Sequence, residues 1–128
     1  MVVTGLVLAC AAALLHVYIW VMESLTWTSA RTRATFGTTR EQAEATKELA
    51  FNQGFYNLFL AIAVALGTLM YAAGRTEAGA TLVFTGAGSM VAAGVVLLTS
   101  SPSKARAALV QLVPPLLGVL ALGVGLVL

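Results

Sequence analysis

Four long apolar stretches occupy most of this 128-residue chain. They cover about residues 2–22, 49–73, 80–99 and 107–128. A helix rises about 1.5 Å per residue, so each stretch is long enough to cross a hydrocarbon core about 30 Å thick. Apolar residues make up 59% of the chain and charged residues only 9%, which a water-soluble domain of this size could hardly accommodate. The sequence therefore predicts a small integral membrane protein whose main partner is the lipid bilayer.

The basic residues predict how the chain is oriented in the membrane. All but one of the seven fall between the first and second stretches or between the third and fourth, and they are Arg31, Arg33, Arg40, Lys47, Lys104 and Arg106. By the positive-inside rule, residues 24–48 and 100–106 face the cytoplasm and both termini face outward. We expect a multi-pass protein of the bacterial cytoplasmic (inner) membrane. Basic residues placed to set orientation give no reason to expect a nucleic-acid partner.

Short connections leave room for one domain over residues 1–128 and predict an all-α, antiparallel four-helix membrane bundle. The long cytoplasmic connection contains two candidate capping boxes, Thr38 with Glu41 and Thr39 with Gln42. The second helix should therefore begin in water near Arg40 and project from the bilayer.

Smaller signals predict where the helices end and how they pack. Turns are expected at Phe36-Gly37, at residues 74–79 and at residues 100–103. Glycine and alanine in the third and fourth stretches should let helix backbones approach closely. Pro114-Pro115 should bend the fourth helix and free backbone carbonyls near Gln111.

Few polar groups interrupt the apolar stretches, and most lie toward the cytoplasmic side. As candidate ligand-binding residues we take His16, Trp20, Glu23, Asn52, Gln53, Tyr56, Asn57 and Gln111. Counting from the midpoints of the stretches places His16 at the depth of Asn57, and Glu23 at the depth of Asn52. The outer half contains mostly small and apolar residues. The pattern predicts a polar pocket open to the cytoplasm or inner leaflet, sealed from outside, and it disfavours a continuous pore.

Structural roles compete with this interpretation. Glu23 could end the first helix at the interface, and Trp20 could anchor the chain there. The histidine and the amides could form interhelical hydrogen bonds, although each such bond contributes only about 0.6 kcal/mol to stability on average.

Metal and cofactor chemistry has little support in the sequence. One His, one Cys and no Asp offer too few ligands for a zinc or copper site. A Ser-His-Asp arrangement and a phosphate-binding glycine loop are both missing. We therefore expect no metal and no cofactor, and leave catalytic residues unassigned.

The polar pattern resembles a known family across essentially the whole chain. It runs through His16, Tyr18, Glu23, Trp27 and Phe36, then Asn52-Gln53-Gly54-Phe55-Tyr56-Asn57, and ends with Val110-Gln111 before Pro114. This is similar to the small bacterial membrane proteins grouped as domain of unknown function 1304. Where that family commonly has Ala after the proline, this chain has Pro115. The resemblance implies the four-helix fold and the same site residues but supplies no substrate.

Three functions stay open at this point. The pocket could bind, and as part of a carrier transport, a small amphipathic or lipophilic molecule, with His16 exchanging a proton and Glu23 supplying charge. It could instead be a membrane enzyme that moves protons on a lipid-like substrate, for example in an isomerisation. The third alternative is a structural or regulatory partner protein without a small-molecule site. The oligomeric state is open as well, with a homo-oligomer among the alternatives.

Overall fold

A computed structural model describes all residues 1–128 and contains helices but no strands. The four long helices are α1 (Val2–Trp20), α3 (Arg40–Ala72), α4 (Thr76–Ser100) and α5 (Ala105–Val127). The shorter elements are the π-helical turn η1 (Val21–Leu25), helix α2 (Ala30–Phe36) and the 3-10 turn η2 (Pro102–Lys104). Each long helix, with its adjoining turn, is long and apolar enough to cross a membrane. The predicted apolar stretches all fall on these helices.

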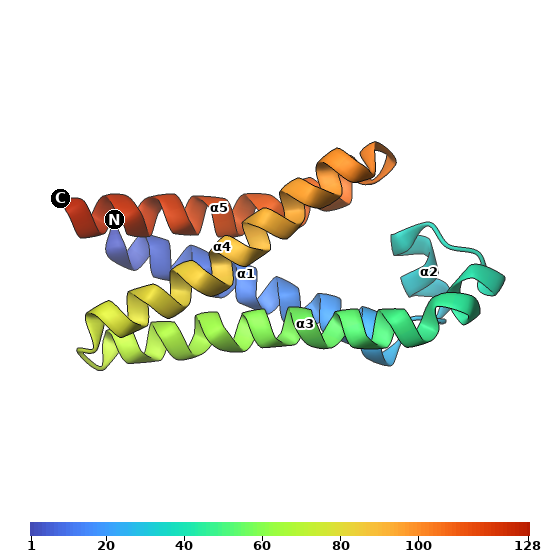
Figure 1. The fold of residues 1–128 in the computed structure, drawn as a ribbon, viewed down its shortest axis with the longest axis horizontal. Coiled ribbons are helices and arrows are strands. Elements are labelled where there is room, and N and C mark those ends of the chain that lie inside the picture. Colours follow the sequence, from blue (N-terminus) through green and yellow to red (C-terminus); the bar gives the residue numbers. More distant parts are fainter.

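The long helices lie alongside one another, and each packs against two others. Helix α1 packs against α3 and α5, and α4 packs against the same two helices. Figure 1 shows the two chain termini at one end, together with the turn between α3 and α4. We call this the terminal end. The opposite end, called the charged end, holds η1, α2 and η2, and there α4 and α5 diverge from α1 and α3 (Figure 1).

Local sequence explains where the helices begin and end at the charged end. Thr39 and Gln42 form the predicted capping box, because the Thr39 hydroxyl accepts from Gln42 N at 3.1 Å and the Gln42 side chain accepts from Thr39 N at 2.9 Å. The other predicted box, beginning at Thr38, does not form. Helix α2 ends at Gly37, whose φ of 67° is the left-handed conformation that glycine adopts easily.

Close packing of small side chains defines the terminal end. A Cβ atom added to Gly67 would lie 2.7 Å from the Gly79 carbonyl oxygen, and one added to Gly118 would lie 2.9 Å from Ala9 N. The buried core is correspondingly rich in small residues: Ala9, Ala12, Ala13, Ala61, Val64, Val83, Ala87, Met90 and Leu122. Backbones that approach this closely gain dispersion contacts along the whole interface. The terminal end therefore closes mainly through contacts between small apolar groups.

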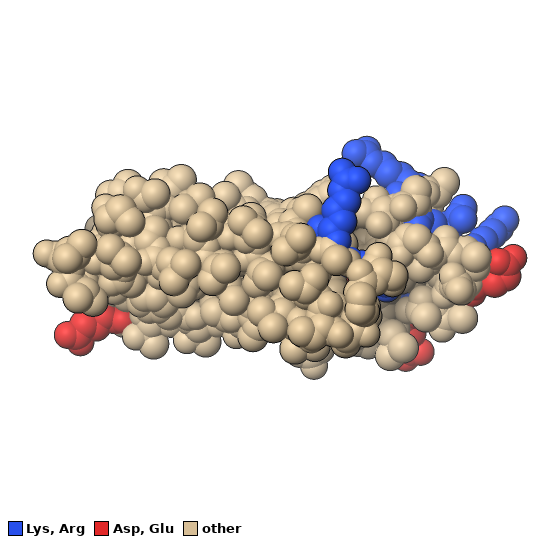
Figure 2. All heavy atoms as spheres, turned by 90° about the horizontal axis from the view of Figure 1, so that it is seen from above, with Lys and Arg blue, Asp and Glu red and all other residues tan.

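Charged side chains are concentrated at the other end of the molecule. Figure 2 shows Lys and Arg gathered toward one end, with a long region between the ends that carries no charge on the visible face. The basic residues of α2, of the start of α3 and of η2 all belong to this charged end.

Two elements of the structure were not expected from the sequence. Helix α2 interrupts the long connection, starting at Ser29, whose hydroxyl accepts from Thr32 N at 3.2 Å. The π-helical turn η1 continues α1, with Thr26 N donating to Val21 O at 3.0 Å, a wider turn than the α-helical spacing. The outer turn predicted over residues 74–79 is shorter in the structure, because residues 76–79 already belong to α4, where Gly79 packs against Tyr71 and Gly67.

Candidate functional site

The π-helical turn η1 rests against the middle of α3, at a position that only glycine can occupy. A Cβ atom added to Gly54 would overlap with Ser24 Oγ and lie 3.1 Å from both Glu23 Cβ and Ser24 N. The Ser24 hydroxyl donates to Phe51 O at 2.8 Å, which fixes the turn to α3. Widened π turns occur often at functional sites, where they change the direction of a side chain. Here the widened turn carries Glu23.

The Glu23 carboxylate is held by an amide on the neighbouring helix. Asn57 Nδ2 donates to Glu23 Oε2 at 2.8 Å and also to Gln53 O at 3.2 Å. The second carboxylate oxygen, Oε1, receives no hydrogen bond from the protein. It is also not fully buried. Glu23 therefore keeps one oxygen open to a ligand or to water.

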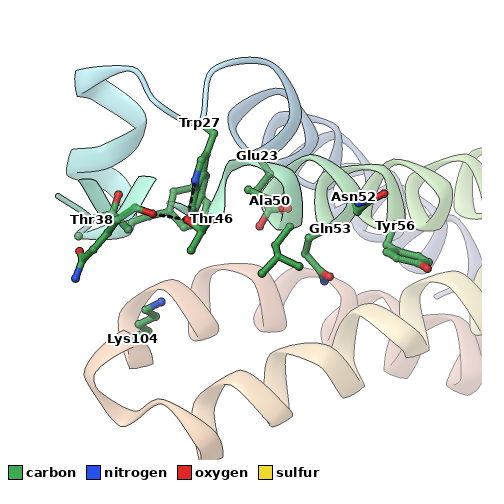
Figure 3. Close-up of a pocket in the computed structure, with 13 residues that line it drawn as sticks. Glu23, Trp27, Thr38, Thr46, Ala50, Asn52, Gln53, Tyr56 and Lys104 are labelled. Carbon is green, nitrogen blue, oxygen red and sulfur yellow. Dashed lines mark hydrogen bonds between the residues drawn. The ribbon is translucent and has the colours of Figure 1, made fainter. Parts of the chain in front are cut away.

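A cleft of about 900 Å³ lies at the charged end, beside Glu23. Its walls combine polar, aromatic and small side chains: Glu23, Trp27, Phe36, Gly37, Thr38, Gln42, Thr46, Leu49, Ala50, Asn52, Gln53, Tyr56 and Lys104. Figure 3 shows Lys104 on the α4–α5 side of the cleft and the other labelled residues on the opposite side. Glu23 is the only acidic lining residue and Lys104 the only basic one.

Trp27 forms a rigid part of the cleft wall. Its indole Nε1 donates to Thr46 Oγ1 at 3.1 Å, and Thr46 Oγ1 in turn donates to Gln42 O at 2.7 Å (Figure 3). The Trp27 ring meets the Phe36 ring edge to face, with centroids 4.9 Å apart. These contacts attach the connection between α1 and α3 to the start of α3, and so shape the mouth of the cleft.

A second hollow, of about 500 Å³, lies on the other side of Glu23. Its lining includes Glu44, Lys47, Glu48 and Phe51. Because these charged side chains are exposed, we interpret this hollow as hydrated surface. The larger cleft is the candidate site.

Half of the residues predicted as ligand-binding line this cleft: Glu23, Asn52, Gln53 and Tyr56. Asn57 is in direct contact with the site through its bond to Glu23 but is not itself a lining residue. Asn52 donates to Glu48 O at 3.2 Å within its own helix and is exposed, as are Gln53 and Tyr56.

The other predicted residues lie elsewhere. His16 is 2% exposed, and its Nδ1 donates to Ala12 O at 2.9 Å, one turn back in the same helix. Trp20 packs edge to face on Phe55, with ring centroids 5.9 Å apart, and its indole N–H is buried without a partner. Gln111 is partly exposed on α5 and does not line the cleft.

The predicted depth pairing of the first stretch with α3 was wrong by more than one helical turn. Asn57 bonds to Glu23, whereas counting placed Asn57 beside His16 and Asn52 beside Glu23. Counting from midpoints assumes two straight α-helices that begin at matched depths. Here the π-helical turn carries Glu23 in a wider coil, and Gly54 sets where it meets α3.

Sequence reasoning missed the part of the site outside the apolar stretches. Thr46, Phe36 and Lys104 lie in connections or in the water-exposed start of α3, where polar residues carry no signal of depth. Only the fold brings them to Glu23. Nowhere in the chain do three His, Cys, Asp or Glu side chains converge, so no residue set here could hold a metal ion in the usual way.

The chain matches the family described as "Protein of unknown function (DUF1304)" over residues 10–123. It belongs to this family. The match confirms the resemblance seen in the sequence and includes every residue that lines the cleft. The comparison with curated proteins gives no match, and neither does the comparison with solved structures. The description of the DUF1304 family assigns no activity, so function must be argued from the cleft.

Proposed function

We propose that this DUF1304 protein spans the bacterial cytoplasmic membrane and that its cleft binds a small amphipathic molecule from the inner leaflet. Both termini then face outward, and the charged end lies at the cytoplasmic surface. The concentration of basic residues at that end supports this orientation. Four helices long and apolar enough to cross a membrane support the location.

The mixed lining of the cleft carries the proposal. Amide, hydroxyl and carboxylate groups lie on the same walls as Trp27, Phe36 and Leu49. Ligand sites typically combine apolar surface with a few polar groups that fix orientation. An amphipathic molecule would place its head among the polar groups and its apolar part against the aromatic and aliphatic side chains.

The closed terminal end argues for binding from one side and against a channel. Gly5, Gly67 and Gly118 bring backbones together there, and the nearby polar side chains Cys10 and Thr68 are bonded to each other, with Cys10 Sγ donating to Thr68 Oγ1 at 3.6 Å. Release on the outer side would require the helices to move apart. The protein is therefore a binding protein, or the loading state of a carrier.

The enzyme hypothesis has less support from the geometry. It needed His16 and Glu23 as an acid and a base, but His16 is buried, bonded to its own helix and absent from the cleft lining. A purely structural role leaves the open Glu23 oxygen and the cleft without a purpose.

Photo-crosslinking tests the binding proposal. The protein in lipid nanodiscs is irradiated with a diazirine-labelled long-chain alcohol, a neutral amphipathic probe, and labelled peptides are mapped. We expect labelling of the cleft segments 36–56, reduced severalfold by Gln53→Trp, which fills the cleft. Thr85→Trp, on an exposed face of α4, is the matched control and should leave cleft labelling unchanged. Labelling spread evenly over lipid-facing surfaces and insensitive to Gln53→Trp would overturn the proposal.

A further inference from the structure

Glu23 is the one acidic side chain that lines the cleft. It is the only Asp, Glu, Lys or Arg residue in the first candidate span, Val2–Leu25. A charge in that position costs free energy unless something compensates for it. Its partner in the chain is the neutral Asn57 amide, which occupies Oε2 and leaves Oε1 open. The carboxylate therefore lacks a positive partner within the protein.

Aromatic rings line the same cleft as Glu23. Trp27, Phe36 and Tyr56 all line the cleft, and Tyr56 is 64% exposed, so its ring face is free. Aromatic faces attract cations, most strongly when water is excluded. A carboxylate together with aromatic rings is the combination that recognises an organic cation.

Lys104 is the one group that opposes a cation in the cleft. It is exposed, and it lies on the turn η2 across the cleft from α3 (Figure 3). Water screens an exposed charge far more than a partly buried one, so Glu23 outweighs Lys104 in the electrostatics of a bound ligand. Lys104 should weaken cation binding modestly.

We propose that the cleft selects lipophilic organic cations, such as hydrophobic amines or quaternary onium ions. The positive group lies at Glu23 Oε1, and the apolar part lies against Trp27 and Tyr56. This inference rests on the proposed function, because it names the ligand class of the same cleft.

Two ions of the same shape and opposite charge provide the test. Tetraphenylphosphonium and tetraphenylborate are titrated into the protein in detergent micelles, and binding is followed by tryptophan fluorescence. The unsubstituted protein and each variant are titrated in the same micelles, so that partition of the ions into micelles cancels when their Kd values are compared. We expect saturable binding of tetraphenylphosphonium and none of tetraphenylborate. Equal binding of both ions would overturn the proposal.

Glu23→Gln keeps the size of the side chain and an acceptor for Asn57 but removes the charge. It should raise the Kd for tetraphenylphosphonium about tenfold, the equivalent of about 1.4 kcal/mol. Glu23→Asp should restore part of the affinity, and Glu77→Gln, at the terminal end, should change nothing. An unchanged Kd in Glu23→Gln contradicts the proposal.

Two exposed positions keep the proposal testable if the Glu23 variants do not fold. Tyr56→Leu retains apolar area but removes the ring, and should weaken tetraphenylphosphonium binding about threefold. Lys104→Met should strengthen it by a similar factor. Weaker binding in Lys104→Met would contradict the proposal.

The outcomes separate this inference from the proposed function. If the neutral diazirine alcohol labels the cleft but tetraphenylphosphonium shows no preference, only the cation proposal fails. If neither probe reaches the cleft, both proposals fail.

Discussion

The terminal end and the charged end of this bundle are built from different kinds of contact. At the terminal end, glycines bring helix backbones together, as where a Cβ on Gly67 would lie 2.7 Å from Gly79 O. At the charged end, hydrogen bonds between side chains link the elements, through pairs such as Asn57 with Glu23 and Trp27 with Thr46. The cleft lies only among the second kind of contact.

The difference shows how a small bundle can combine a seal with a site. Backbones in contact leave no space for a ligand and lose stability if any atom is added. Hydrogen bonds between side chains have modest free energies in membranes, so these groups can exchange partners with a ligand. Toward the charged end, Gly54 and Gly94 are also in close contact with their neighbours: Gly54 anchors the turn that carries Glu23, and a Cβ added to Gly94 would lie 2.9 Å from Leu112 Cβ.

The largest effect should come from enlarging a glycine at the terminal end. We expect Gly67→Val to lower the free energy of unfolding by about 1–3 kcal/mol or more, because its side chain would displace the backbone of α4. Gly88→Val is the matched control, since nothing lies within 4 Å of a Cβ there, and it should be nearly neutral. Thermal unfolding in detergent measures both. Similar losses in the two variants would mean that the terminal end is not closely packed.

A second, smaller loss is expected where η1 meets α3. Gly54→Ala should cost about 1–2 kcal/mol, because Ser24 can rotate away but Ser24 N and Glu23 Cβ must also shift. Adding Ser24→Ala should recover part of that cost, as expected for two residues in direct contact. Thermal unfolding is measured for the unsubstituted protein, the two single variants and the double variant. Strict additivity would show that the two residues do not touch.

Loosening the mouth of the cleft should have a local effect. Thr46→Val removes the acceptor for Trp27 Nε1 at nearly constant size, at a cost of about 0.5–1.5 kcal/mol. Hydrogen exchange should become faster in residues 27–36 and stay unchanged in α5. A uniform increase over the whole chain would show instead that this connection stabilises the entire bundle.

The smallest effect on stability should come from the polar pair itself. Asn57→Ala removes the bond to Glu23 and should cost about 0.6 kcal/mol, the average for interhelical bonds in membranes. Thermal unfolding of Asn57→Ala and of Gly54→Ala, measured under the same conditions, compares the two losses of stability. A loss larger than that of Gly54→Ala would favour the structural alternative, in which these groups hold the bundle together.

The sequence was sufficient for the fold but only partly for the site. Length and hydropathy predict helices such as α3, and the Thr39–Gln42 capping box predicts where that helix begins. These signals depend on residues close together in the sequence, so they can be recognised without knowledge of the tertiary contacts. Glu23, Gln53 and Tyr56 were found because polar groups in apolar stretches stand out.

What could not be predicted depends on helix rotation and on local changes of helix geometry. His16 and Glu23 both stood out as polar residues of the first apolar stretch, yet His16 faces the buried interior. The π turn at η1 and the glycine contact at Gly54 set the register between α1 and α3, and neither has a reliable sequence signature. Lys104 joins the cleft only through tertiary structure.

We propose that the cleft opens only to the cytoplasm and that the terminal end is sealed. Cysteine labelling from each side of the membrane is the most direct test of this proposal. In a Cys10→Ala background, Gln53→Cys in the cleft and Leu122→Cys in the core are treated with a membrane-impermeant maleimide in vesicles of both orientations. The account predicts that Gln53→Cys reacts only from the cytoplasmic face, and that Leu122→Cys reacts from neither face until the protein is unfolded. Labelling of Gln53→Cys from outside, or equal reactivity of the two cysteines, would contradict it.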